Sequence, residues 1–171
     1  VLAGTGEPGE SGDGGPASEA TFKERGGTAI APDDSIFVSD RPSNRVRVIR
    51  PDGTIHAYAG TGEQGEAGDG GPATEAELFY NEGIALDSAG NLYTGNGLAY
   101  IADAVNHRIR RVDADTGIIT TVAGTGEGGF NGDGPATETL LQFPRGLGIG
   151  PDDRLSVPAS FTPDLLDPTD D

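Results

Sequence analysis

The sequence predicts an all-β fold assembled from repeated units of four short antiparallel strands. The first observation is an internal repeat, whose copies begin near Ala3, Ala59 and Ala123. The second is that short β-branched or alternating runs within each copy are separated by turn residues. The third is composition: 29 glycines and 12 prolines in 171 residues follow no collagen-like period, so they indicate many tight turns between many short strands.

The repeat is defined by two sequence motifs that keep their register. AGTGE begins at Ala3, Ala59 and Ala123, at spacings of 56 and 64 residues. GDGGPA follows at 12–17 and 68–73, and the third copy has a shortened GDGPA at 132–136. We assign the longer second spacing to an insert near 94–100 and one extra residue around Asp115.

Four strands are expected in the best-preserved copy, namely 83–87, 91–103, 108–113 and 118–123. The turns between them are Ser88-Ala89-Gly90, Val105-Asn106-His107 and Asp115-Thr116-Gly117. Four short antiparallel strands per unit make one blade of a β-propeller.

The segment 124–143 and its equivalents are expected to connect successive blades. A glycine-rich loop is followed by Pro-Ala-Thr-Glu, in which proline at the first helical position predicts one helical turn. Three apolar residues at equivalent places are expected to be buried plugs between neighbouring blades: Phe22, Leu78 and Leu141.

These residues resemble a known family. Gly90-Asn91-Leu92-Tyr93, then Ile101-Ala102-Asp103, Asn106 to Asp113 and Thr121-Val122-Ala123-Gly124 are similar to the NHL repeat signature. The loop AGTGExGxxGDGGPA resembles the form found in bacterial secreted and surface members. The resemblance covers Val1 to about Val157 and implies blades of a ring of about six. This chain would then hold two complete blades flanked by partial ones, which is an incomplete ring.

Two segments depart from the signature. Arg41-Pro42-Ser43-Asn44-Arg45 stands where the second copy has Asn-His-Arg, and this leaves the blade intact. The residues from Pro158 to Asp171 fit no strand and are expected to form an acidic, proline-rich tail or linker. Because the chain opens on Val1 rather than methionine, we expect it to be processed or to be a segment of something longer.

Charge and composition exclude several classes of function. The formal net charge of −17 disfavours binding to nucleic acid. The absence of cysteine excludes disulfides and thiolate chemistry, and no apolar run approaches the roughly 18 residues of a membrane span.

The two histidines, His56 and His107, are candidates for a metal site or a general base. They lie at different heights of different blades, so we expect them not to converge, and we expect no catalytic or metal site and no cofactor. Some NHL relatives are lyases with a histidine-held zinc, and this chain lacks the third ligand.

The acidic residues are interpreted as turn residues. Asp13, Asp69 and Asp133 recur in the glycine loops near Glu10 and Glu66, and oxygen-rich loops of this kind hold calcium in other proteins. A single aspartate per repeat is more typical of an Asx cap on its own turn. The pairs Asp33-Asp34 and Asp152-Asp153 are likewise expected in strand-to-strand turns.

The arginines are the remaining candidates for a binding surface. A basic stripe could resemble that of RNA-binding NHL propellers, but alternation along a strand favours ladders with carboxylates on the outer blade. The residues concerned are Arg45, Arg47, Arg108, Arg110 and Arg111.

The sequence therefore favours a non-enzymatic scaffold at the cell surface or outside the cell that binds a protein or a glycan, through residues that the sequence does not single out. The alternative is a structural subunit whose open blade edges self-associate into an extracellular filament. A fragment of an NHL-type lyase is the third alternative.

Overall fold

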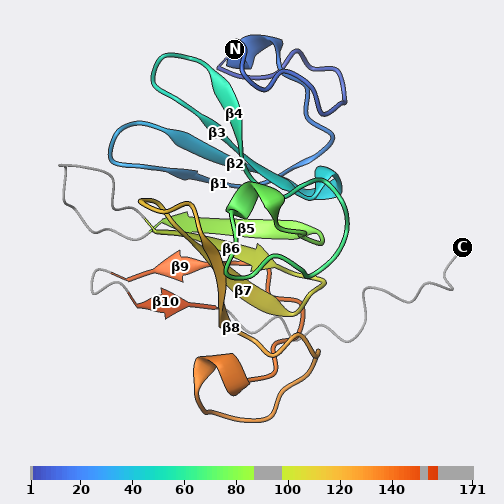
Figure 1. The fold of residues 1–171 in the computed structure, drawn as a ribbon, viewed down its shortest axis with the longest axis vertical. Helices are drawn as coiled ribbons and strands as arrows, with labels where there is room; N and C mark the ends of the chain where they lie inside the picture. Colours follow the sequence, from blue (N-terminus) through green and yellow to red (C-terminus); the bar gives the residue numbers. More distant parts are fainter. Residues whose placement is uncertain (1, 87–97, 151–153, 158–171) are drawn as a thin grey trace, which may run out of the picture.

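The computed structural model describes residues 2–86, 98–150 and 154–157. Two four-stranded antiparallel sheets and one two-stranded sheet follow each other along the chain (Figure 1). Blade 1 has the order β1-β2-β3-β4 and blade 2 the order β5-β6-β7-β8, and a half-blade is formed by β9 and β10. The predicted blades are confirmed, and in the described residues the ring is not closed.

The strands of the two complete blades are equivalent in order and differ by no more than one residue in length. Blade 1 contains β1 (Arg25–Ile30), β2 (Ile36–Asp40), β3 (Arg45–Ile49) and β4 (Ile55–Ala59). Blade 2 contains β5 (Asn81–Leu86), β6 (Leu98–Asp103), β7 (Arg108–Asp113) and β8 (Ile119–Ala123). The half-blade contains β9 (Gly148–Ile149) and β10 (Leu155–Ser156).

The strand predictions are largely confirmed. The third strand has the expected bounds, the fourth begins one residue later, and the first begins two residues earlier than expected, at Asn81. The expected stretch 91–97, the turn 88–90, Asp152-Asp153 and the tail 158–171 lie outside the described residues. Most of the insert near 94–100 lies outside them as well.

Three equivalent loops connect the strands of successive units. We call them loop 1 (residues 3–22), loop 2 (59–78) and loop 3 (123–141). Each carries one short helical turn: η1 (Ala17–Glu19), η3 (Ala73–Glu75) and η4 (Ala136–Glu138). The turns are 3-10 rather than α-helical, and the proline precedes the first helical residue instead of occupying it. A fourth turn, η2 (Arg41–Ser43), joins β2 to β3.

Glycine at the second position of the second and third AGTGE motifs allows a loop to pass close to the preceding blade. Gly60 has φ +91°, and a Cβ there would lie 2.1 Å from the carbonyl oxygen of Asn44. Gly124 has φ +87°, and a Cβ would lie 2.2 Å from the carbonyl oxygen of His107. Only glycine fits both the left-handed backbone and the close approach.

The main core lies between the two complete blades. β1 packs against β5, and β5 packs in turn against β9. The core combines side chains of both blades with residues of loop 2: Val46, Ala59, Ala73, Ala76, Leu78, Ile84, Ile101, Val112 and Ile119. Small residues of loop 2 thus fill the space between the blades, which is why few large side chains suffice.

The plug prediction is correct for one residue of three. Leu78 is fully buried because blades lie on both sides of it. Phe22 and Leu141 are only half-buried, since each lies toward an end of the described structure where one neighbouring blade is lacking.

Candidate binding face

Two arginines fix loops 1 and 2 to their blades. Arg47 on β3 donates through Nε to Asp13 Oδ1 (2.8 Å), through Nη1 to the carbonyl of Thr21 (2.8 Å) and through Nη2 to that of Ser11 (3.0 Å). Its guanidinium also lies over the ring of Phe22, 4.9 Å from the centroid.

Arg110 on β7 repeats this network in blade 2. It donates to Asp69 Oδ1 from Nε (2.9 Å) and Nη2 (2.7 Å), and to the carbonyls of Glu77 (2.6 Å) and Ala67 (3.3 Å). Asp69 also accepts the backbone N–H of Thr121 on β8 (3.0 Å). We call each of these networks an arginine clamp.

The clamps correct two sequence expectations. Arg47 and Arg110 are 1% and 0% exposed, so they are not part of an outer ladder or of a basic stripe that RNA could contact. Asp13 and Asp69 accept from a buried arginine instead of capping their own turns. The aspartate of the GDG motif and the arginine of the third strand therefore act together to hold the loop to the blade.

A second pair of arginines links neighbouring loops near the surface. Arg45 lies 3.3 Å from Glu10 of loop 1 and donates to the carbonyl of Thr61 in loop 2 (2.7 Å). Arg108 lies 3.2 Å from Glu66 of loop 2 and donates to the carbonyl of Thr125 in loop 3 (3.3 Å). These two arginines do pair with carboxylates, as expected.

The two histidines are not brought together. His56 on β4 lies 3.0 Å from Thr54 Oγ1, whereas His107 lies in the turn between β6 and β7 of the other blade. Nδ1 of His107 accepts the backbone N–H of Phe143 (3.2 Å). Asn44 occupies the equivalent place in blade 1, and its Oδ1 accepts the N–H of Tyr80 (3.0 Å). Both residues have a positive φ, 53° and 49°.

His107 is therefore a latch between a blade and the segment that follows it. Because Nδ1 is the acceptor, the ring is neutral with its proton on Nε2. Partial burial lowers the pKa of His107, which favours the same neutral form.

Each blade also buries one aspartate at the end of its second strand. Asp103 accepts the N–H of Phe79 (2.8 Å) and Nδ2 of Asn106 (2.9 Å), and Nη1 of Arg110 lies 3.8 Å away. Asp40 accepts the N–H of Glu24 (3.3 Å) and of Lys23 (3.4 Å). Burial raises the pKa of Asp103 to about 6 and raises that of Asp40 as well.

The carboxylate pair Asp33-Asp34 has the predicted turn role. Asp33 accepts both the N–H and the hydroxyl of Ser35 at 3.0 Å, and Asp34 has a φ of 67°. In the described part of the chain, no three histidine, aspartate or glutamate side chains group as metal ligands would.

One group of side chains that differs between the repeats lies at the end of the blades where the second strands finish. The β2–β3 and β6–β7 turns lie at this end, together with the residues that join the inter-blade loops to β1 and β5, and we call it the loop face. There Arg41 pairs with Glu24 and with Glu82 (3.1 Å) and lies over the ring of Tyr80, 5.5 Å from its centroid. Tyr80 is 37% exposed, and the equivalent of Arg41 in blade 2 is the buried Ala104.

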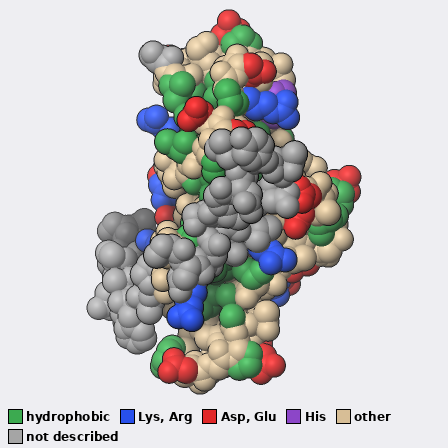
Figure 2. Space-filling model, turned by 90° about the vertical axis from the view of Figure 1, so that its left-hand side faces the viewer, with side chains coloured by type: hydrophobic (Ala, Val, Ile, Leu, Met, Phe, Trp, Pro, Cys, Tyr) green, Lys and Arg blue, Asp and Glu red, His purple; other side chains and the backbone are tan. Residues whose placement is uncertain are grey.

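The view of Figure 2 shows acidic and basic side chains interspersed, without a patch of one sign. Among the described residues, a hollow of about 600 Å³ lies beside loop 1 and has Glu24 in its lining, and another of about 620 Å³ lies beside loop 3. None of the helical turns described is long and apolar enough to cross a membrane.

Comparison with known proteins identifies repeat-containing relatives. The chain is 33% identical to NHL repeat-containing protein 2 of Homo sapiens over 142 residues, which are 77% of this chain and 19% of that protein. It is 29% identical over 146 residues to the chloroplastic Protein SUPPRESSOR OF QUENCHING 1 of Arabidopsis thaliana, covering 80% of this chain and 13% of the relative. The chain thus spans a fifth or less of these relatives. No family model matches.

Solved structures share the fold. An auxiliary nutrient binding protein from Bacteroides thetaiotaomicron superimposes with a TM-score of 0.67 at 16% identity, over 82% of this chain and 35% of that one. A protein of unknown function from the same species gives a TM-score of 0.56 at 26% identity, over 67% of this chain and 27% of the other. This likeness supports the assignment of the two sheets as blades.

Proposed function

Since the chain belongs to the NHL-repeat family of β-propeller proteins, we propose that it is a non-enzymatic scaffold that binds a protein or a glycan through its loop face. The observation that carries this proposal is how the two complete repeats use their polar side chains. Asp13, Arg47, Asp69 and Arg110 are all occupied by the clamps, and His107 by the latch. The repeated motif is therefore explained by architecture.

The unrepeated residues of the loop face are the ones left to recognise a ligand. Tyr80 and Arg41 provide an aromatic ring and a cation at one place, and Glu24 and Glu82 provide acceptors beside them. Aromatic rings and arginine are enriched where proteins bind partners. An extracellular location is supported by the resemblance of the AGTGE and GDGGPA loops to those of secreted family members.

Arrays of extracellular proteins and of glycans test this proposal. The wild-type chain should bind members of one array, and Tyr80→Ala or Arg41→Ala should weaken that binding at least tenfold. Arg50→Ala is the matched control, because Arg50 is exposed next to the β3–β4 turn at the opposite end of blade 1. A chain that binds nothing on either array, or that loses as much with Arg50→Ala, contradicts the proposal.

The alternative of a self-assembling subunit draws on the free edge of β10, which pairs only with β9 among the described strands. Unpaired edges favour association with another chain. Under this alternative, light scattering should show species that grow with concentration, and removal of residues 158–171 should abolish them.

A further inference from the structure

Loop 3 is shorter than loops 1 and 2, because it has GDGPA where they have GDGGPA. All three loops nevertheless keep the bond from the first glycine of AGTGE to the carbonyl of the alanine that begins the helical turn. These bonds measure 2.9 Å and join Gly4 to Ala17, Gly60 to Ala73 and Gly124 to Ala136. Another contact must therefore make up for the glycine that loop 3 lacks.

Loops 1 and 2 are closed by the backbone. The residue that precedes the GDG motif accepts, through its carbonyl, the N–H of a residue near the end of the loop. These bonds join Thr21 to Ser11 (3.1 Å) and Glu77 to Ala67 (3.0 Å). Since one acceptor is a serine and the other an alanine, the bond needs no particular side chain.

Asn131 closes loop 3 with its side chain instead. The N–H of Leu140 donates to Oδ1 of Asn131 (2.9 Å), and Nδ2 of Asn131 donates to the carbonyl of Glu138 (3.0 Å). An asparagine amide offers both an acceptor and a donor, and it extends beyond the backbone. Asn131 thus spans the gap left by the missing glycine and fastens the start of the loop to the end of η4.

Asn131 is followed by Gly132, and this pair of residues is chemically reactive. The backbone nitrogen of Gly132 can attack Cγ of Asn131 and close a five-membered succinimide, while Nδ2 leaves as ammonia and takes up the proton of the attacking N–H. Water then opens the ring at either carbonyl and gives aspartate or isoaspartate. Glycine favours the attack because it has no Cβ, and a Cβ at Gly132 would meet no atom within 4 Å.

The two hydrogen bonds of Asn131 oppose this reaction. Attack requires Cγ to come within roughly 3–3.5 Å of the nitrogen of Gly132, and rotation of the side chain is restrained while both amide atoms are bonded. Water does reach the residue, because Asn131 is exposed. Its equivalents Ser11 and Ala67 are also exposed although complete blades lie beside them, so this exposure belongs to the position in the repeat.

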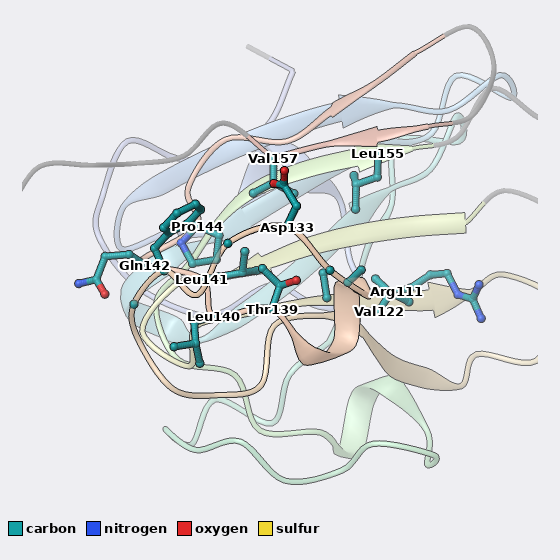
Figure 3. Close-up of a pocket in the computed structure, with 16 residues that line it drawn as sticks. Arg111, Val122, Asp133, Thr139, Leu140, Leu141, Gln142, Pro144, Leu155 and Val157 are labelled. Atoms are coloured by element: carbon teal, nitrogen blue, oxygen red, sulfur yellow. The ribbon is translucent and has the colours of Figure 1, made fainter.

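We propose that Asn131-Gly132 is a deamidation site whose conversion releases loop 3. In the product an oxygen replaces Nδ2 beside the carbonyl of Glu138, so that two acceptors face each other without a proton between them. Leu140 follows this turn and lines the hollow beside loop 3 (Figure 3). Deamidation is therefore a one-way change that loosens one wall of this hollow, and it is independent of the loop face.

Mass spectrometry of the 171-residue chain tests the reaction. Folded chain and chain unfolded in guanidinium chloride are aged at mildly alkaline pH and then cleaved after glutamate at acidic pH. Fragment 128–138 contains Asn131 as its only amide side chain, which separates it from Asn96-Gly97, the other such pair in the sequence. We expect this fragment to deamidate at least tenfold more slowly in the folded chain. Equal rates, or no deamidation in the unfolded chain, would overturn the proposal.

Limited proteolysis of the folded chain tests the release of the loop. The helical turns of the three loops end on equivalent glutamates, Glu19, Glu75 and Glu138. A glutamate-specific protease should cut Asn131→Asp after Glu138 at least tenfold faster than the wild type, because cleavage follows local opening. Cleavage after Glu19 and Glu75 should change less than twofold. Unchanged cleavage after Glu138, or equal acceleration at all three glutamates, contradicts the proposal.

A loop 3 of full length is the matched control. Insertion of a glycine after Gly134 restores GDGGPA, so the backbone carbonyl of residue 131 can accept the N–H of Leu140, as Ser11 and Ala67 do in their loops. In this background Asn131→Asp should change cleavage after Glu138 less than twofold. A tenfold acceleration here as well would show that the Asn131 amide does not replace the missing glycine, and the proposal would fail.

Discussion

Loops 2 and 3 share the AGTGE motif and the backbone bond from its first glycine to the helical turn, although loop 3 lacks one glycine of GDGGPA, and they differ in what surrounds them. Loop 2 lies between two complete blades, with Leu78 fully buried and Asp69 bonded to Arg110. Loop 3 lies against a half-blade, with Leu141 half-buried and Asp133 exposed. The loop therefore acquires its shape from local hydrogen bonds and its anchorage from the third and fourth strands. The loop and the arginine strand therefore form a joint between two elements, and loop 3 shows that the loop can be described without a clamp arginine beside it.

We expect the largest change in the free energy of unfolding when an arginine clamp is removed. Arg110→Ala removes a buried cation, which leaves Asp69 without its charged partner and two loop carbonyls without their donor. We expect a loss of about 3 kcal/mol in the free energy of unfolding, at the lower end for a broken buried pair because Asp69 is partly exposed. Urea unfolding followed by circular dichroism measures it.

Arg50→Ala is the control for that prediction, since Arg50 is exposed, and it should change the free energy of unfolding by less than about 0.5 kcal/mol. Equal losses in the two variants would show that the clamp contributes no more than a surface arginine.

Substitution of the plug residues tests the same difference between loops 2 and 3 for apolar packing. Leu78→Ala should cost about 3 kcal/mol, because a cavity opens in a core closed on both sides. Leu141→Ala should cost about 1 kcal/mol, because its side chain is already partly in water. If the two variants unfold at the same urea concentration, the third loop is packed as tightly as the second.

The sequence was sufficient for the blades but not for the joints between them. Repeat spacing and β-branched runs predicted the strands because both are local properties, and the turn role of Asp33 followed from chemistry within three residues. The pairing of Asp69 with Arg110 joins residues 41 positions apart, and alternation alone places Arg110 on a surface. The signal that could have revealed it is that the aspartate and the arginine recur together in both complete copies.

Burial of the plugs could not be predicted from the sequence for a related reason. Phe22, Leu78 and Leu141 occupy equivalent positions in the repeat, so the motif alone predicts equal burial for the three side chains. Their actual burial depends on how many blades lie beside each, and this is a property of the whole fold.

The smallest expected effect concerns pH and compares the two latches, His107 and Asn44. Protonation of His107 would remove the acceptor of the Phe143 N–H, whereas Asn44 accepts from Tyr80 at any pH. Because burial puts the pKa of His107 in the folded chain below its ordinary value of 6.5, the latch stabilises the fold fully above pH 6.5. That contribution is lost as the pH falls through the lowered pKa. The pKa of Asp103 is raised to about 6, so protonation of Asp103 stabilises the fold as the pH falls through this range, which is opposite to the effect of His107. The wild type must therefore be compared with a variant that keeps Asp103.

His107→Asn is that variant, since it places in blade 2 the residue that blade 1 already uses. We expect it to match the wild type near pH 7.5 and to be more stable by up to about 1 kcal/mol near pH 5, the net contribution of one hydrogen bond. Urea unfolding at the two pH values measures the difference. His56→Asn should leave the pH dependence of the wild type in place, because His56 contacts Thr54 and lies away from the joint. Parallel pH profiles for the wild type and His107→Asn would mean that the Phe143 N–H gains nothing from the imidazole, and that other contacts hold the third unit to blade 2, such as the bond from Arg108 to Thr125 and the packing of β5 against β9.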